Sequence, residues 1–498
     1  MTRAAAVRYD ASGDPMERKA SMDTPTHIPL HDDLRAVVGD DGLITQPEEL
    51  LPYECDGLTV ARVQPSAVVF PQDTAQAAAV IRVLNDHGVP FAPRGAGTSL
   101  SAGTLALRGA VHISTSRMNR VLETDLRNRQ MRVQAGVINL HVSNAVAADG
   151  YFFAPDPSSQ PACTIGGNVA YNSGGPHTLK YGVMVNHLLG VTLVTPEGEI
   201  VEAGGPAEDP VGYDLTGLIC GSEGTFGLVT EVILRLMPSP EDHRTMLVVF
   251  DRTEDAINCV SDMIGEGIVP VALEFMDQMI TRAVEDAYHF GLPRDAEAVL
   301  IIELEGLQAG LDRQADRVEE MCQRHGAVRV RRANSEQERL ELWMCRKRAF
   351  GAIGRLSPSY ITQDGVVPRT RLPEMLAYVA EVAREYDVRI ANVFHAGDGN
   401  IHPIALYDER DPEQTKRVLR ASAKILARAM ALGGSPTGEH GIGLEKARQL
   451  AIMYNPDDLA AMRRLREVFD PDERANPGKV FGGEGVPEVF NEMAMAGD

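Results

Sequence analysis

Two histidines and a glutamate in the last quarter of the chain have the types and spacing of a metal site. An apolar strand pattern ends at His395, Asp398-Gly399 signals a turn, and a second strand pattern leads into His402. We expect a hairpin that brings the two histidines across from each other. Glu439 follows in a glycine loop, and two histidines with one carboxylate suit a catalytic divalent metal with positions open for substrate. The alternative is a pair of hairpin histidines bonded to the backbone.

Three glycine-rich loops point to a second kind of chemistry, the binding of a large anionic cofactor. They span residues 93–100, 155–175 and 221–227. Small residues let successive backbone N–H groups converge on an anion, and the asparagines of the second loop can hydrogen-bond a polar heterocycle. No loop has the Rossmann pattern, a G-x-G-x-x-G that opens a helix. Plain turns are the alternative, but three such loops within about 130 residues exceed what turns require.

The hydrophobic pattern predicts two regions of different secondary structure, which must position these residues. From about residue 50 to 238 the chain is rich in glycine and β-branched residues, with one helix from Thr74 to Gly88 and strands at 68–70, 89–92, 110–114, 131–135, 188–195 and 228–236. From about 245 to 432, strands alternate with longer helices, which we expect on one face of a layer. The strands are 246–250, 271–275, 299–304 and 328–330; the helices are 309–324, 335–350, 372–386 and 413–432. The fold class is α+β.

Length and composition limit the possible functions. A chain of 498 residues should hold about two to four domains, and 44% hydrophobic with 24% charged residues is typical of a globular protein. The net charge of −22 repels phosphate backbones, so we expect no nucleic-acid partner. No apolar run approaches the ~18 residues of a membrane helix, so we expect no transmembrane segment.

The six cysteines are scattered and form no C-x-x-C pair. This pattern indicates a reducing compartment and excludes an iron–sulfur cluster held by this chain alone. If the protein moves electrons, a partner must carry the metal relay. Residues 1–45 lack the continuous apolar stretch of a secretory signal, and we expect them to form a flexible N-terminal extension.

Together the glycine loops resemble the vanillyl-alcohol-oxidase-type FAD-binding domain. The matching motifs are P-R-G-A-G-T-S-L at 93–100, T-I-G-G-N-x-A-x-N-S-G-G at 164–175 and G-S-E-G-T-F-G at 221–227. The resemblance implies a two-sheet domain with the FAD pyrophosphate on the first loop and the flavin and ribityl chain against the other two. It assigns FAD contacts to Arg94, Gly95, Ala96, Gly97, Thr98, Ser99, Gly103, Pro155, Asp156, Thr164, Gly166, Gly167, Asn168, Asn172, Glu223, Gly224, Val229 and Asn476.

Some members of that family attach FAD covalently through a histidine in the first loop. In this chain Thr98 stands next to Ser99 at that place. We therefore expect FAD to be bound non-covalently.

The histidine motifs are similar to those of the FAD-linked D-2-hydroxy-acid dehydrogenase branch of this family, and closest to its glycolate-oxidising flavoprotein subunits. They are F-H-A-G-D-G-N-I-H-P at 394–403 and T-G-E-H-G-I-G-x-E-K at 437–446. The resemblance implies that zinc, or another divalent ion, binds His395, His402 and Glu439. Such an ion acts on the substrate hydroxyl as a Lewis acid.

The same resemblance assigns two catalytic side chains. His440 is left free beside the metal ligands, and an imidazole with an ordinary pKa near ~6.5 can take the hydroxyl proton at neutral pH; its alternative role is to orient Glu439. Arg346, in a basic helical stretch, is assigned to the substrate carboxylate, which suits a planar guanidinium. Lys347 and Arg348 are weaker candidates, and a solvated helix face is the alternative. Dicarboxylate-specific members carry a lysine in the segment aligned with 360–364, which has none here.

These resemblances predict four parts: the extension (1–45), the FAD-binding domain (46–240), an α+β substrate or cap domain with the metal motif (241–435), and a C-terminal segment that returns to the flavin and completes both sites (436–498). We expect FAD-dependent oxidation of a small 2-hydroxy acid, glycolate first, to the 2-oxo acid. Electrons would pass to companion flavoprotein and iron–sulfur subunits, or to a quinone or carrier, in the cytoplasm or at the inner face of the membrane. A self-sufficient D-lactate dehydrogenase is the runner-up. A non-catalytic flavin-binding subunit and a metal hydrolase are the alternatives from other classes.

Overall fold

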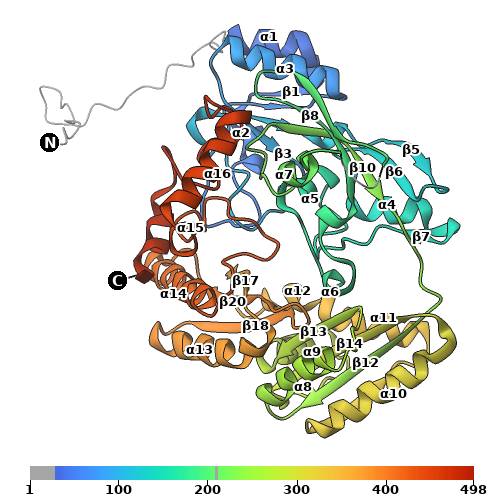
Figure 1. The fold of residues 1–498 in the computed structure, drawn as a ribbon. Coiled ribbons are helices and arrows are strands. Elements are labelled where there is room, and N and C mark those ends of the chain that lie inside the picture. Colours follow the sequence, from blue (N-terminus) through green and yellow to red (C-terminus); the bar gives the residue numbers. More distant parts are fainter. Residues whose placement is uncertain (1–28, 208–210, 498) are drawn as a thin grey trace, which may run out of the picture.

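The computed structural model describes residues 29–207 and 211–497, which form two domains joined along one side by a C-terminal segment (Figure 1). The first domain, residues 29–238, lies at the top of Figure 1, and the second, residues 242–435, lies at the bottom. Within these described residues, no helix combines the length and the apolar character needed to cross a membrane.

Two sheets build the first domain. Their strands are β1 (Leu43–Ile44), β2 (Val68–Val69), β3 (Phe91–Arg94), β4 (Val111–Ser114), β5 (Val121–Asp125), β6 (Gln130–Gln134), β8 (Leu188–Val194), β9 (Ile200–Gly204) and β10 (Leu228–Arg235); β7 (Tyr151–Phe152) and β11 (Met237–Pro238) pair separately. One sheet has the order β1-β2-β4-β3, with β2, β4 and β3 parallel. The other is antiparallel, with the order β5-β6-β10-β8-β9. All predicted strands of this region are confirmed, with boundaries shifted by one or two residues.

The helices of this domain are short. They are α1 (Pro29–Val38), α2 (Pro47–Leu50), α3 (Thr74–Asp86), α4 (Asn139–Val146), α5 (Ile165–Tyr171), α6 (Thr178–Tyr181) and α7 (Leu215–Ile219). The helix predicted from Thr74 is confirmed as α3. Its N-cap is Asp73, whose Oδ1 accepts a hydrogen bond from the Gln76 N–H at 2.8 Å.

The prediction that residues 1–45 form a flexible extension is wrong for residues 29–45. Helix α1 buries Leu30, Leu34 and Val38 in one apolar cluster with α3, and β1 pairs with β2. The helix is amphipathic, and its apolar stripe gains stability only by packing on the sheet domain. Residues 1–28 lie outside the described residues.

A nine-stranded sheet forms the centre of the second domain. The order is β15-β12-β14-β13-β18-β19-β17, and β20 pairs with both β16 and β18. The strands are β12 (Asp242–Phe250), β13 (Ala272–Asp277), β14 (Ala298–Gly306), β15 (Ala327–Arg332), β16 (Ser359–Thr362), β17 (Gly365–Val366), β18 (Arg389–His395), β19 (Asn400–Ile401) and β20 (Pro403–Tyr407). The helices are α8 (Thr253–Gly265), α9 (Gln278–Tyr288), α10 (Gln308–Arg324), α11 (Glu336–Lys347), α12 (Ala349–Ile353), α13 (Leu372–Glu385) and α14 (Pro412–Ala431). The predicted strands and helices of this region are confirmed.

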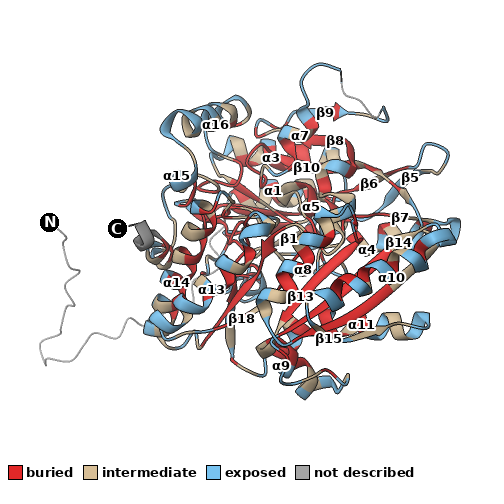
Figure 2. Ribbon diagram, turned by 60° about the horizontal axis from the view of Figure 1, so that its bottom comes forward, coloured by how far each residue is buried: buried red, intermediate tan, exposed pale blue. Residues whose placement is uncertain are grey.

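Helices cover both faces of this sheet, so the prediction of helices on one face is wrong. α8, α10, α13 and α14 share one apolar cluster with the sheet, and α9, α11 and α12 share another. Strands β12 and β14 are buried along most of their length on both faces, and Figure 2 shows β14 in the colour of buried residues. The continuous apolar run at Val299–Ile302 is the sequence signal for such burial, because a strand with one solvated face alternates in polarity.

The predicted histidine hairpin is confirmed, with a different register. β18 and β19 pair antiparallel, and His395 lies opposite Asn400 rather than opposite His402. His402 follows two residues later, and the centroids of the two imidazole rings are 5.2 Å apart.

Helices α15 (Leu450–Met453) and α16 (Pro456–Phe469) belong to the C-terminal segment. After them the chain returns to the first domain, where Ala475 bridges to Phe91 of β3 and the Asn476 N–H donates to the Phe91 carbonyl at 2.7 Å. The same segment also contacts the second domain, where Glu492 Oε2 is 2.7 Å from Arg420 Nε of α14.

The turn at α6 makes a second contact between the domains, and it is ionic (Figure 1). His177, just before α6, has its Nδ1 2.6 Å from Asp156 Oδ2 and its Nε2 3.9 Å from Glu303 Oε1 on β14. Two residues along β14, Glu305 binds Lys180 Nζ at 2.9 Å. Burial lowers the pKa of His177, but the carboxylates of Asp156 and Glu303 outweigh this effect and raise the pKa to about 10.

We expect this histidine to stabilise the association of the two domains in a pH-dependent way. Its pKa rises from ~6.5 in the unfolded chain to about 10 in the fold, so its contribution is complete below pH ~6.5 and is lost as the pH rises toward 10. His177→Gln should lower the apparent melting temperature at pH 7 by roughly 3–8 °C. The difference in melting temperature between His177→Gln and wild type should become smaller at pH 9.5, as measured in thermal melts of both proteins. A difference in melting temperature that increases with pH would contradict the stabilising role of His177.

Candidate functional site

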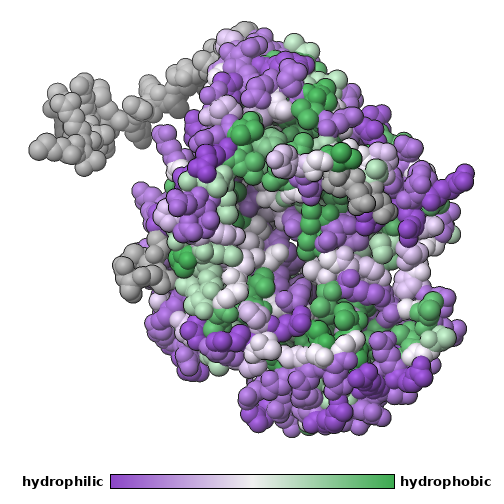
Figure 3. Space-filling model, viewed as in Figure 1, coloured by the Kyte–Doolittle hydropathy of each residue, from purple (hydrophilic) through white to green (hydrophobic). Residues whose placement is uncertain are grey.

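A cavity of about 350 Å³ lies between the two domains, where the surface in Figure 3 is hollowed. From the second domain and the C-terminal segment it is lined by Phe350, Tyr360, Thr362, His402, Glu439 and His440. Most of its remaining wall comes from the three glycine loops. The predicted cofactor residues that line it are Arg94, Gly95, Ala96, Gly97, Thr98, Ser99, Gly103, Thr164, Gly166, Gly167, Asn168, Glu223, Gly224, Val229 and Asn476. The cavity thus joins the predicted cofactor loops to part of the predicted metal motif.

The first loop needs its glycines because it passes close to other groups. A Cβ at Gly95 would lie 2.3 Å from Thr164 Oγ1 of the second loop. Gly97 has φ +71°, and a Cβ there would lie 2.4 Å from Arg94 Nη2. The Arg94 guanidinium donates to the Cys55 carbonyl at 2.9 Å and to Thr104 Oγ1 at 3.2 Å. Backbone N–H groups, rather than long side chains, are therefore what this loop can offer an anion.

Three predicted cofactor residues do not line the cavity. Asp156 is paired with His177, and the Pro155 carbonyl accepts from Asn139 Nδ2 at 3.0 Å. Asn172 ends α5 with φ 50°, and its Oδ1 accepts from the Val185 N–H at 2.9 Å. These side chains and carbonyls support the second loop.

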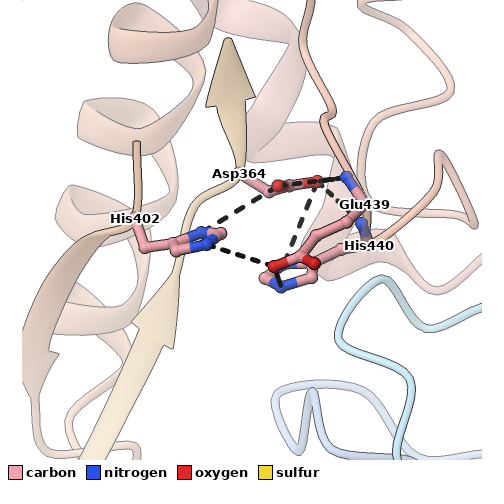
Figure 4. A group of neighbouring side chains, drawn as sticks. All are labelled: Asp364, His402, Glu439 and His440. Atoms are coloured by element: carbon pink, nitrogen blue, oxygen red, sulfur yellow. Dashed lines mark hydrogen bonds and ion pairs between the residues drawn. The ribbon is translucent and has the colours of Figure 1, made fainter. Parts of the chain in front are cut away.

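The predicted metal residues converge on one carboxylate oxygen. Glu439 Oε1 is 3.5 Å from His395 Nε2, 3.2 Å from His402 Nε2 and 3.7 Å from His440 Nε2. In the described chain, Asp364, His402, Glu439 and His440 each offer a possible ligand atom within 4.8 Å of the others (Figure 4). His395 is not in this group of four, although its Nε2 also faces Glu439 Oε1. Imidazole nitrogens with a carboxylate oxygen form a donor set that suits a divalent transition metal.

A fully buried carboxylate that sequence reasoning missed, Glu274, orients His395. Its Oε1 is 2.6 Å from His395 Nδ1, and its Oε2 accepts from Arg346 Nε at 2.6 Å. Burial raises the pKa of Glu274, but His395 and Arg346 outweigh this effect and lower the pKa to about 2. Because the carboxylate occupies Nδ1, the Nε2 of His395 is the nitrogen that faces Glu439. The signal in the sequence was one acid inside the apolar strand pattern at 271–275.

Arg346 lies in this ion pair and does not line the cavity. Its side chain is only 3% exposed, and its Nη2 has no hydrogen-bond partner among the described residues. Of the weaker candidates, Arg348 lies over the ring of Tyr288.

His440 lies beside the metal residues, where its ring stacks on His402 at 5.1 Å between centroids. Burial lowers the pKa of His440 to about 4, below the ordinary value expected from the sequence, so its imidazole is neutral at pH 7 and is a weaker base than expected. Asp364, a second carboxylate missed from the sequence, accepts the backbone N–H groups of Gly438, Glu439 and His440 at 2.9, 3.1 and 2.8 Å. It fixes the backbone that carries the side chains of Glu439 and His440.

Comparison with known proteins identifies the family. Residues 65–204 match the family described as FAD binding domain, and residues 239–480 match that described as FAD linked oxidases, C-terminal domain. The chain belongs to the FAD-linked oxidases. The resemblance of the glycine loops to an FAD-binding domain is thereby confirmed, and the protein is an FAD-linked oxidoreductase rather than a metal hydrolase.

Relatives and solved structures agree with this family. The chain is 45% identical to glycolate oxidase subunit GlcD of Escherichia coli (strain K12) over 432 residues, which cover 87% of each protein. It is 32% identical to a D-lactate dehydrogenase of Anaerostipes hadrus over 84% of this chain and 90% of that protein. The structure of 4-ethylphenol oxidase from Gulosibacter chungangensis matches with a TM-score of 0.76 at 18% identity, over 91% of this chain and 96% of that one. The predicted α+β fold of vanillyl-alcohol-oxidase type is confirmed.

We expect denaturation to release the FAD of this oxidoreductase. The loop at 95–99 has no histidine, since Thr98 and Ser99 stand where a covalent link would form. Acid precipitation of the yellow holoprotein should leave the ~450 nm chromophore in the supernatant, measured by absorbance of both fractions. Colour that stays with the precipitate would contradict non-covalent binding.

Proposed function

We propose that the protein oxidises a small 2-hydroxy acid, glycolate in the first place, to the 2-oxo acid. The observation that carries the proposal is the convergence of His395, His402, His440 and Glu439 beside a cavity whose other wall is the family's FAD-binding domain. One wall can hold the flavin, and the other can hold and deprotonate the substrate.

The glycine loops would hold the FAD. The close approach of Gly95 to Thr164 leaves backbone N–H groups and hydroxyls as donors for a pyrophosphate. Bound flavin supplies the chemistry of accepting a hydride. The residues that line the cavity bind and orient it and exclude water.

His395, His402 and Glu439 are the proposed ligands of a divalent metal, zinc or another ion. Asp364 is a poorer ligand because its Oδ2 already accepts three backbone N–H groups. When bound, a divalent ion lowers the pKa of the substrate hydroxyl and fixes its orientation. Glu274 supports the site by holding His395 through Nδ1.

His440 is the proposed general base. Its neutral imidazole can take the hydroxyl proton at Nε2, the ring nitrogen that faces Glu439 Oε1 at 3.7 Å. Arg346, which the family resemblance assigns to the substrate carboxylate, does not line the cavity and would reach a substrate only after its side chain moves. Its Nη2 has no hydrogen-bond partner among the described residues, while its Nε is held by Glu274.

The charges of the cavity favour a monocarboxylate. Phe350, Tyr360 and Thr362, the lining residues of the second domain outside the metal motif, are uncharged. The guanidinium of Arg94 is bonded to backbone and hydroxyl oxygens of its own domain. A second carboxylate on the substrate would therefore lack a counter-ion. Glycolate fits, and D-lactate is the alternative supported by the related D-lactate dehydrogenase.

Dye reduction by the purified flavoprotein tests the proposal. We expect glycolate or D-lactate to bleach the flavin and reduce an artificial dye, and dicarboxylic 2-hydroxy acids to be poor substrates. His402→Ala should keep its FAD, because the flavin loops lie in the other domain, and should lose at least about 100-fold in kcat. Chelation of the wild type should mimic this loss, with recovery on addition of a divalent ion. Full turnover by His402→Ala would reject the metal site, and an inactive wild type would reject the reaction.

We further propose that companion subunits take the electrons at the cytoplasmic face of the membrane. All six cysteines are free, and all but Cys55 are buried, so this chain alone lacks a relay. The related glycolate oxidase protein is named as a subunit. A companion flavoprotein and an iron–sulfur subunit would suit this need; a quinone or carrier is the alternative.

Co-expression with neighbouring genes tests the partner. We expect the chain to elute from gel filtration in a flavin peak that also contains iron and a cysteine-rich polypeptide. The isolated chain should reduce dyes but reduce quinone slowly. An iron-free peak with full quinone activity would favour the self-sufficient D-lactate type.

A further inference from the structure

Glu439 and His440 lie in residues 437–443, here called the His440 loop. None of these residues belongs to a helix or strand. Its position therefore depends on contacts from outside the loop. On the side of the second domain Asp364 accepts its first N–H groups. On the side of the first domain, Glu223 accepts hydrogen bonds from the last two N–H groups of the loop.

Glu223 uses both carboxylate oxygens for this contact. Its Oε1 accepts from the Ile442 N–H at 2.6 Å, and its Oε2 accepts from the Gly443 N–H at 2.7 Å. The two donors follow His440 by two and three residues. Glu223 is 4% exposed. Burial raises the pKa of its carboxyl, while the N–H groups of Ile442 and Gly443 lower it, because they favour the ionised form.

The glycines of the loop show how closely it follows the first domain. Gly441 has φ +78°, and a Cβ there would lie 2.8 Å from Glu223 Oε1. Gly443 has φ +55°, and a Cβ there would lie 2.0 Å from the Ser101 carbonyl oxygen. Ser101 also donates from Oγ to the His440 carbonyl at 3.0 Å. The backbone on both sides of Ile442 is therefore fixed against the first domain.

We propose that Glu223 is a positioning residue that holds the His440 loop, and with it the general base, against the flavin-binding domain. The inference rests on the proposed function for the role of His440. Family resemblance assigns Glu223 to FAD contact, but both of its carboxylate oxygens are engaged by the loop. Its backbone carbonyl accepts from Asn476 Nδ2 at 2.7 Å. One residue thus ties a flavin loop, the His440 loop and the C-terminal segment together.

The test compares Glu223→Gln with Glu231→Gln in the full-length holoprotein. Glutamine keeps the size of the side chain, but it offers one acceptor oxygen and turns an N–H₂ toward one of the two donors. Glu231, on β10, pairs with Arg132 at 2.7 Å and does not line the cavity. It is the matched control for loss of a carboxylate in the same domain.

Three quantities separate positioning from flavin binding. Glu223→Gln should keep its flavin content, lose about 10- to 100-fold in kcat, since small misplacements of a catalytic group have effects of this size, and change KM much less. Hydrogen exchange of the peptide that covers residues 437–445 should become faster. Glu223→Asp, which keeps two acceptor oxygens on a shorter side chain, should recover part of the rate, and Glu231→Gln should match wild type in all three quantities.

Two results would overturn the inference. One is that Glu223→Gln has the kcat of wild type and the same rate of hydrogen exchange in residues 437–445. The other is a loss of activity that follows a loss of flavin, which would make Glu223 a flavin ligand. If Glu223→Gln does not fold, the same two criteria apply to Glu223→Asp. Failure of the proposed function has a different signature, because wild type would then oxidise no 2-hydroxy acid while the exchange measurement, which needs no substrate, still decides the positioning role.

Discussion

Two buried carboxylates from different domains hold the same irregular loop, and the site depends on this arrangement. Asp364 of the second domain accepts backbone N–H groups at the start of the His440 loop, and Glu223 of the first domain accepts those at its end. A carboxylate without partners in such surroundings would destabilise the fold by several kcal/mol. Each carboxylate instead accepts hydrogen bonds from backbone N–H groups of the loop. The two buried carboxylates therefore determine where Glu439 and His440 lie.

This arrangement explains why the site lies between domains rather than within one. The first domain supplies loops whose glycines leave the backbone accessible, and the second supplies the ends of β18 and β19, where His395 and His402 are fixed by the sheet and by Glu274. Neither domain alone encloses the cavity. The ionic contact of α6 with β14 and the return of the C-terminal segment to β3 hold the two domains in a fixed relative position. Relative domain motion is thereby restrained at these two places.

Local signals predicted the parts of the site, and long-range contacts explain what was missed. Glycine loops, the hairpin turn and strand patterns are properties of adjacent residues, and they placed His395, His402 and the cofactor loops. Glu274 is 121 positions from His395 and 72 from Arg346, so no local pattern reveals that one carboxylate bonds both. Asp364 and Glu223 act through backbone N–H groups, which every non-proline residue has. Likewise, helices on both faces of the second sheet follow from packing that the order of elements leaves open.

Two histidines near carboxylates show how geometry decides protonation in this protein. His177 Nδ1 is 2.6 Å from Asp156 Oδ2, and the carboxylates of Asp156 and Glu303 outweigh burial and raise the histidine pKa to about 10. His440 Nδ1 is 4.0 Å from Asp364 Oδ2, an oxygen already engaged by backbone N–H groups, and burial lowers the histidine pKa to about 4. The same residue type is thus a cation where it joins the domains and a neutral imidazole where it faces the cavity. Desolvation disfavours the charged imidazole unless an acceptor compensates directly. Because Asp364 is engaged mainly with the loop backbone, burial outweighs its charge and His440 stays neutral.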